Sequence, residues 1–118
     1  MSGIQMALLG ASGGPPLSVT ADDAIGYADG PASSGFVVTN NSTNTTAAGG
    51  VAPYTYAWSR VSGASPSISS TTAQNPGWSA TVFDGVESVS VWRVTVTDSV
   101  SSTTYVDIGV YLTWVDTR

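Results

Sequence analysis

Apolar and polar positions alternate along short stretches of this chain. In the clearest stretch, Tyr54, Tyr56 and Trp58 occupy every second position after a Gly-Gly pair and a proline. A period of two residues is typical of a β-strand that buries one face. We therefore expect a strand here, with Trp58 in the interior of a sandwich.

Two later segments repeat this period, over residues 89–97 and 105–114. Each has one continuous apolar face, as expected for strands at the centre of a domain. The faces predicted to be buried are Trp92, Val94 and Val96 in the first, and Val106, Ile108, Val110, Leu112 and Trp114 in the second.

Weaker patterns predict further strands over residues 17–21, 35–40, 67–69 and 78–83. Residues 24–27 are expected to form only a short crossing segment, because aspartates and a Gly-Pro pair surround them. The polar run 41–46 either continues the strand before it past a bulge or forms a loop. The predicted core comprises Val19, Val37, Tyr56, Trp58, Ile68, Phe83, Trp92, Val94, Val96, Val106, Ile108, Val110 and Leu112.

The strings GGVAPYTYAW and VTVTD resemble motifs of PKD-like and bacterial immunoglobulin-like repeats, over residues 49–113. With the MSGIQM start, the Gly-rich segment and WSRVSG, the chain most closely resembles small immunoglobulin-like proteins from the virion structural genes of tailed bacteriophages. The resemblance implies an all-β, immunoglobulin-like β-sandwich of about seven strands. It also implies a place in the virion, on a capsid, neck or tail protein.

The chain length of 118 residues fits one such domain with a short extension. We expect residues 1–16 to form an N-terminal arm and a Gly/Pro hinge, and residues 17–118 to form the sandwich. The arm has four large apolar side chains that could dock on a partner: Ile4, Met6, Leu8 and Leu9. The alternatives are that the arm folds back on its own sandwich or frays. The apolar run lacks a basic flank and is too short to span a bilayer, so neither a signal peptide nor a membrane helix is predicted.

Composition removes most catalytic chemistry. The sequence has no His, no Cys and no Lys, so the usual general base, thiolate, Schiff-base amine and nitrogen or sulfur metal ligands are missing. We therefore predict no enzyme activity and no cofactor. The net charge is -5 and the only cations are three scattered arginines, which disfavours nucleic acid as a partner.

Carboxylates offer two further interpretations. Asp84 and Glu87 could form a glycosidase-like pair, but the aspartate lies in a predicted tight turn, where it is better explained as a turn residue. Asp22, Asp23 and Asp29 could supply some oxygens to calcium, although no D-x-D-x-D-G loop is present. The prediction is therefore no metal site.

Tyrosines provide the last candidate surface. Tyr54, Tyr105 and Tyr111 could stack on sugars, but aromatic residues on strands more often form cross-strand pairs or an interface. We expect a non-catalytic virion protein that docks in multiple copies, or as a homo-oligomer, on phage structural proteins. The alternative is a bacterial surface module for carbohydrate binding and adhesion.

Overall fold

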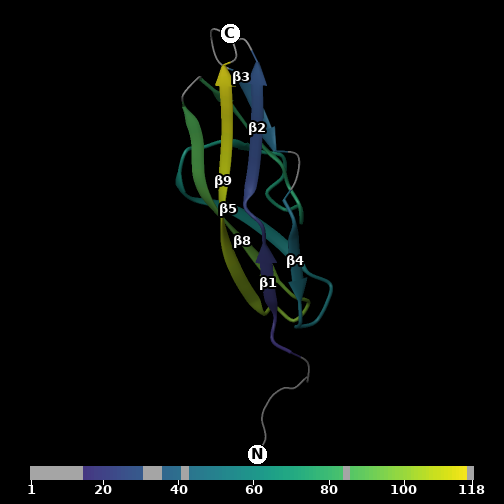
Figure 1. The fold of residues 1–118 in the computed structure, drawn as a ribbon. Coiled ribbons are helices and arrows are strands. Elements are labelled where there is room, and N and C mark those ends of the chain that lie inside the picture. Colours follow the sequence, from purple (N-terminus) through teal and green to yellow (C-terminus); the bar gives the residue numbers. More distant parts are fainter. Residues whose placement is uncertain (1–14, 31–35, 41–42, 84–85, 117–118) are drawn as a thin grey trace, which may run out of the picture.

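The computed structural model describes residues 15–30, 36–40, 43–83 and 86–116. In this part the chain forms nine strands and no helix, so the protein is all-β (Figure 1). The strands are β1 (Ser18–Ala21), β2 (Ala24–Gly30), β3 (Phe36–Asn40), β4 (Thr45–Ala48), β5 (Thr55–Gly63), β6 (Ser67–Ile68), β7 (Trp78–Val82), β8 (Glu87–Thr97) and β9 (Thr103–Asp116).

The strands form two layers. One layer is a four-stranded sheet in the order β2-β9-β8-β5, in which only the β2–β9 pair is parallel. The other layer holds the pair β1-β4 and the three-stranded sheet β3-β7-β6. This order is consistent with an immunoglobulin-like sandwich, in which strands alternate between two facing sheets.

Strand β2 corrects the prediction of a short crossing segment. It has seven residues and pairs along its whole length with β9. Its inward positions Ala24 and Gly26 are small because another strand passes close behind: a Cβ on Gly26 would lie 2.7 Å from the backbone oxygen of Thr39 in β3. The aspartates and the Gly-Pro pair that indicated turns therefore lie within or beside a full strand, and the small residue at position 26 is required by the close approach of β3.

The polar run after β3 separates two strands that belong to different sheets. Thr43 and Asn44 are outside any strand, and β4 begins at Thr45, while residues 41–42 lie outside the described part of the chain. Residues 74–76 pack against this break. The Thr45 amide donates to Asn75 Oδ1 (2.8 Å), and Gln74 Nε2 donates to the Thr45 carbonyl (2.7 Å). The loop between β6 and β7, which contains residues 74–76, therefore satisfies backbone groups of Thr45 that an unbroken strand would have paired.

Three buried tryptophans form the centre of the core. The ring of Trp78 meets Trp58 edge-on at 5.2 Å between centroids and Trp92 at 5.8 Å. Trp58 Nε1 also donates to the Ala73 carbonyl at 2.9 Å, which ties the ring to the loop before β7. The three rings come from both layers, so their contacts join the two sheets.

Most of the predicted core residues are buried or partly buried, but two are not. Val37 is 60% exposed and Phe83 is 53% exposed, whereas their neighbours Val38 and Val82 are buried. In each case the error is a shift of one residue, which moves a side chain to the opposite face of the sheet. The buried members are Trp58, Trp92, Val94, Val96, Ile108, Val110 and Leu112, and the partly buried ones are Val19, Tyr56, Ile68 and Val106.

Candidate functional site

The predicted docking residues Ile4, Met6, Leu8 and Leu9 lie outside the described part of the chain. The last hinge residues, Pro15 and Pro16, are described. They lead into β1 at one end of the sandwich, which we call the entry pole, and β9 ends at the opposite end (Figure 1). The arm is therefore joined to the domain at the entry pole.

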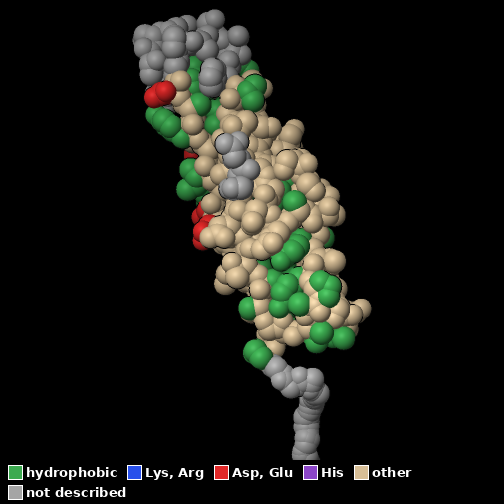
Figure 2. All heavy atoms as spheres, turned by 90° about the vertical axis from the view of Figure 1, so that its right-hand side faces the viewer, with side chains coloured by type: hydrophobic (Ala, Val, Ile, Leu, Met, Phe, Trp, Pro, Cys, Tyr) green, Lys and Arg blue, Asp and Glu red, His purple; other side chains and the backbone are tan. Residues whose placement is uncertain are grey.

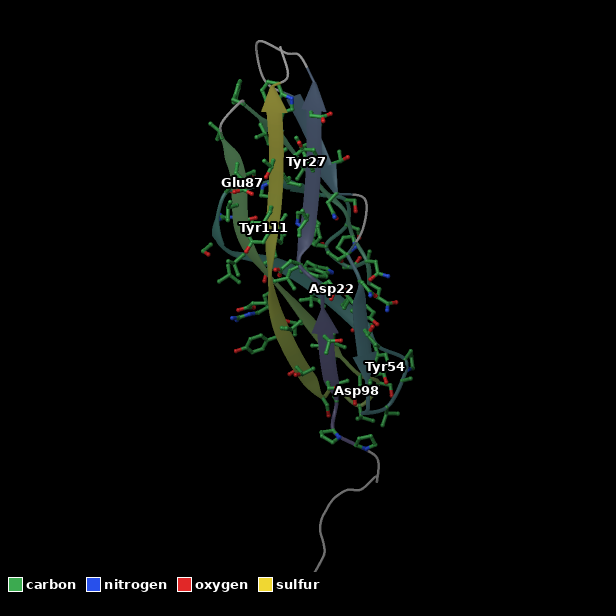
Figure 3. All side chains as sticks on the ribbon, in the orientation of Figure 1. Asp22, Tyr27, Tyr54, Glu87, Asp98 and Tyr111 are labelled. Atoms are coloured by element: carbon green, nitrogen blue, oxygen red, sulfur yellow. The ribbon has the colours of Figure 1, made fainter. Side chains whose placement is uncertain are left out.

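Asp98 organises the entry pole. Its Oδ2 accepts the Val51 amide at 3.0 Å, and its Oδ1 accepts the amides of Val100 and Ser102 at 3.1 and 2.8 Å. One carboxylate thus connects the loop before β5 to the turn between β8 and β9. Figure 3 shows Asp98 and Tyr54 at this end of the molecule.

The pKa of Asp98 reflects two opposing effects. Burial of the carboxylate disfavours its charge, whereas the amides of Ser102, Val51 and Val100 favour it and hold the pKa below its ordinary value. The charged form is therefore the one that the folded entry pole stabilises.

The rest of the pole is also held by backbone contacts. Gly50 N donates to the Pro15 carbonyl at 3.0 Å, and the Tyr54 hydroxyl donates to the Gly49 carbonyl at 2.7 Å. Gly49 and Gly50 have φ of 71° and 56°, a backbone conformation that residues other than glycine rarely adopt. The Gly-Gly pair is thus required by the turn that carries the chain from β4 toward β5.

Between these loops lies a cavity of about 170 Å³, lined by Pro15, Pro16, Leu17, Gly50, Val51, Asp98, Val100 and Ser102. Val51 and Val100 are exposed at its edge. Figure 2 shows apolar side chains gathered toward the end where the described chain begins. The entry pole is therefore a surface of hydrogen-bonded loops with exposed aliphatic side chains.

A second surface covers the outer face of the four-stranded sheet. There Arg93 forms a two-point ion pair with Asp107, with contacts of 2.8 and 3.2 Å, and its guanidinium stacks on Tyr105 at 4.0 Å from the ring centroid. Hydrogen bonding to Asp107 raises the pKa of Arg93, and hydrogen bonding to Arg93 lowers that of Asp107. The charges on this part of the face are therefore compensated within it.

The three candidate tyrosines do not form one patch. Tyr105 and Tyr111 lie on the outer face of the four-stranded sheet. Figure 3 shows Tyr54 far from Tyr111, at the entry pole. Tyr27, which was not among the predicted candidates, is 63% exposed on the same outer face. Its signal was available, because Ile25, Tyr27 and Asp29 alternate with the small residues of β2.

The acidic residues are distributed over separate contacts. Asp23 Oδ1 accepts the Gly109 amide at 2.9 Å, and Glu87 accepts the Thr113 hydroxyl at 2.8 Å, while Asp84 lies outside the described residues. Asp22 lies 3.5 Å from Asn44 Nδ2, and Asp29 is exposed on β2. Among the described residues, no three acidic, histidine or cysteine side chains come together as metal ligands would.

A shallow groove crosses the other layer. It has a volume of about 260 Å³ and is lined by Thr39, Asn40, Ser67, Ile68, Ser69, Gly77, Trp78 and Ser79. Thr39, Ser79 and Ser67 lie opposite one another on β3, β7 and β6, so their hydroxyls form a row without charge. Such a row offers neutral hydrogen bonding and no catalytic group.

Comparison with protein-family models, curated proteins and solved structures finds no match to this chain. In the part of the chain that the structure covers, no helix is long and apolar enough to cross a membrane.

Proposed function

We propose that the chain is a non-catalytic structural subunit of a tailed-phage virion. In this proposal an immunoglobulin-like accessory domain decorates a capsid, neck or tail protein and docks through its N-terminal arm. The single observation that carries it is where the described chain begins: Pro15, which follows the apolar segment with Ile4, Met6, Leu8 and Leu9 in the sequence, is hydrogen-bonded into the entry pole.

The geometry of the pole supports docking over free tethering. The Pro15 carbonyl accepts a hydrogen bond from the Gly50 amide, and Asp98 holds the two neighbouring loops together, so the loops of the pole are already ordered before a partner binds there. With the arm held at this pole, the opposite end of the sandwich, where β9 ends, points away from the partner (Figure 1).

The chemistry of the chain supports a role in assembly. No His, Cys or Lys is present in the sequence to serve as base, nucleophile or Schiff-base amine. Many copies bound to equivalent sites on a symmetric particle would each need only a modest contact, because multivalency raises the total affinity.

The test replaces Ile4, Met6, Leu8 and Leu9 together by serine in a tagged copy of the chain. Tagged copies are supplied during production of the phage whose genome encodes the chain, and particles are purified on a density gradient. We expect incorporation to fall at least about tenfold, since each buried large apolar side chain contributes roughly 1.5 to 3 kcal/mol.

Val37→Ser is the matched control, because this exposed residue lies in β3, away from the entry pole. It should be incorporated like the native chain. Equal incorporation of the arm variant would refute docking through the arm. Absence of the native chain from particles, together with its display on the bacterial surface, would favour the adhesion module instead.

A further inference from the structure

Two exposed valines line the cavity of the entry pole. Val51 is 43% exposed and Val100 is 63% exposed, and both border the cavity together with Pro15 and Pro16, which are exposed as well. We call these four residues the pole patch. They present apolar surface to solvent at the end of the molecule where the described chain begins (Figure 2).

Hydrogen bonds fix the two valines relative to each other. The Val51 amide donates to Asp98 Oδ2 at 3.0 Å, and the Val51 carbonyl accepts the Ser99 amide at 2.8 Å. The Val100 amide donates to Asp98 Oδ1 at 3.1 Å. Because these bonds use the backbone groups of both valines, a partner would meet their exposed side chains already in position.

The pole patch offers apolar contacts without an accessible charge. Asp98 is the only charged residue among the described residues that line the cavity, and it is 6% exposed. Its two carboxylate oxygens accept three backbone amides. A cationic group would therefore meet a carboxylate that is buried and already bonded. Depletion of charge is typical of the centre of protein interfaces, so the patch fits an apolar, uncharged protein surface.

The position of the patch in the chain indicates which protein covers it. Six peptide bonds separate Leu9, the last candidate docking residue of the arm, from Pro15 of the patch. These two residues therefore lie no more than about 22 Å apart, the span of a fully extended chain of that length. A small folded domain is about 30 Å across. A protein that holds the arm therefore has surface within reach of the pole patch.

The short connection also makes a weak contact effective. When one of two linked contacts is made, a short linker gives the second an effective concentration on the order of millimolar. At such a concentration, even a small apolar contact is occupied for much of the time. The pole patch can thus add to the binding without being a strong binding site on its own.

We propose that the pole patch is a second contact with the same virion protein that binds the arm. An apolar, uncharged part of that protein covers Val51 and Val100 and places a side chain in the cavity that they line. This inference rests on the proposed docking through the arm and adds a second binding surface to it. Two contacts fix the orientation of the domain on the particle as well as its attachment.

The experiment places a single thiol in a tagged copy of the chain, which has no native cysteine. Val51→Cys and Val100→Cys probe the patch. The matched controls are Val61→Cys and Val37→Cys, because these valines are 46% and 60% exposed and lie toward the end of β5 and in β3, away from the entry pole. Each variant is reacted with a water-soluble maleimide, both free and on purified particles. Mass spectrometry of the recovered tagged chain gives the rate of modification.

We expect the thiols at positions 51 and 100 to react at least about threefold more slowly on particles than in the free chain. The thiols at positions 37 and 61 should react at the same rate in both. Unchanged rates at positions 51 and 100 would overturn the inference, as would equal protection of all four positions. Slow reaction at positions 51 and 100 already in the free chain would overturn it too, because the occupant would then be the chain's own arm or a second copy.

A second measurement shows whether the contact contributes to binding. Val51→Ser combined with Val100→Ser should speed loss of the tagged chain from diluted particles at least about threefold, since interface changes act mainly on dissociation. Val37→Ser combined with Val61→Ser should leave the rate of loss unchanged. Near-UV circular dichroism establishes that each variant is folded. Equal retention of the two double variants would refute the second contact.

The failure of this inference can be distinguished from the failure of the proposed function. If the native chain is absent from particles, docking through the arm is refuted and the second contact with it. If the chain is present on particles but the thiols at positions 51 and 100 are not protected, only the second contact is refuted.

Discussion

At the residue scale, the tryptophan cluster shows how burial depends on position within a strand. Trp78 contacts two other indole rings in the interior, whereas Phe83, just beyond the end of the same strand, is exposed. Both are large and aromatic, so the sequence does not separate them. Their contributions to stability should differ by the full cost of an internal cavity.

Trp78→Ala should therefore lower the free energy of unfolding by about 3 to 5 kcal/mol, because the cavity removes contacts to both neighbouring rings. Phe83→Ala should change it by no more than about 0.5 kcal/mol, as is usual for surface positions. Urea denaturation followed by tryptophan fluorescence measures both. Equal losses in the two variants would contradict this description of the core.

The lowered pKa of Asp98 predicts that the stability of the fold depends on pH. Its pKa is lower in the folded protein than in an unfolded chain, where it is about 3.9. The stabilisation is therefore complete above the unfolded pKa and is lost as the pH falls through the lower, folded pKa. Asp98→Asn should melt at a lower temperature than the native chain at neutral pH, and the difference should shrink in acid.

Thermal melts between about pH 7 and pH 2 measure this difference. Asp107→Asn is the control, because its carboxylate also has a lowered pKa but lies in an exposed ion pair, which contributes less to stability. A difference for Asp98→Asn that stays constant over the whole range would show that the charge on the carboxylate is not what holds the pole.

At the scale of elements, two strand glycines make different contacts. A Cβ on Gly26 would meet the Thr39 backbone of β3 at 2.7 Å, and that backbone is fixed by pairing with β7. The three atoms nearest to a Cβ on Gly109 all belong to the Tyr111 side chain, whose ring can rotate away. The close approach of β3 therefore restricts the residue at position 26 more than the Tyr111 ring restricts the residue at position 109.

Gly26→Ala should accordingly cost about 1 to 3 kcal/mol of stability, as overpacking typically does. Gly109→Ala should cost less, because only an exposed side chain must move. Chemical denaturation of the two variants side by side tests the difference. A larger loss for Gly109→Ala would mean that the Tyr111 ring is held more firmly than the backbone of β3.

At the scale of the whole molecule, the sandwich should fold without the arm. The described contacts of the entry pole start at Pro15, whose carbonyl accepts the Gly50 amide. A chain that begins at residue 15 retains this bond and all nine strands. Its melting temperature should equal that of the full chain in a thermal melt, and a clear decrease would mean that the arm packs on its own domain.

The sequence by itself determined the class of the protein and most of its central strands. Alternation over residues 54–58, 89–97 and 105–114 placed Trp58, Val94 and Val110 inside, because a period of two residues leaves a strand few ways to bury its apolar face. The lack of imidazole, thiol and lysine amine groups follows from composition alone, since no fold can supply a side chain that the chain does not contain.

Tertiary structure decided the parts where local patterns are ambiguous. In β3, Val37 and Val38 are adjacent and equally apolar, and only pairing with β7 selects Val38 for the core. Around β2, the aspartates and the Gly-Pro pair indicate turns, and only pairing with β9 shows that residues 24–30 form one strand. The row of Ile25, Tyr111 and Val89 and the Asp98 contacts join residues far apart in the chain, and such contacts depend on register and on the packing of layers, which local sequence does not encode.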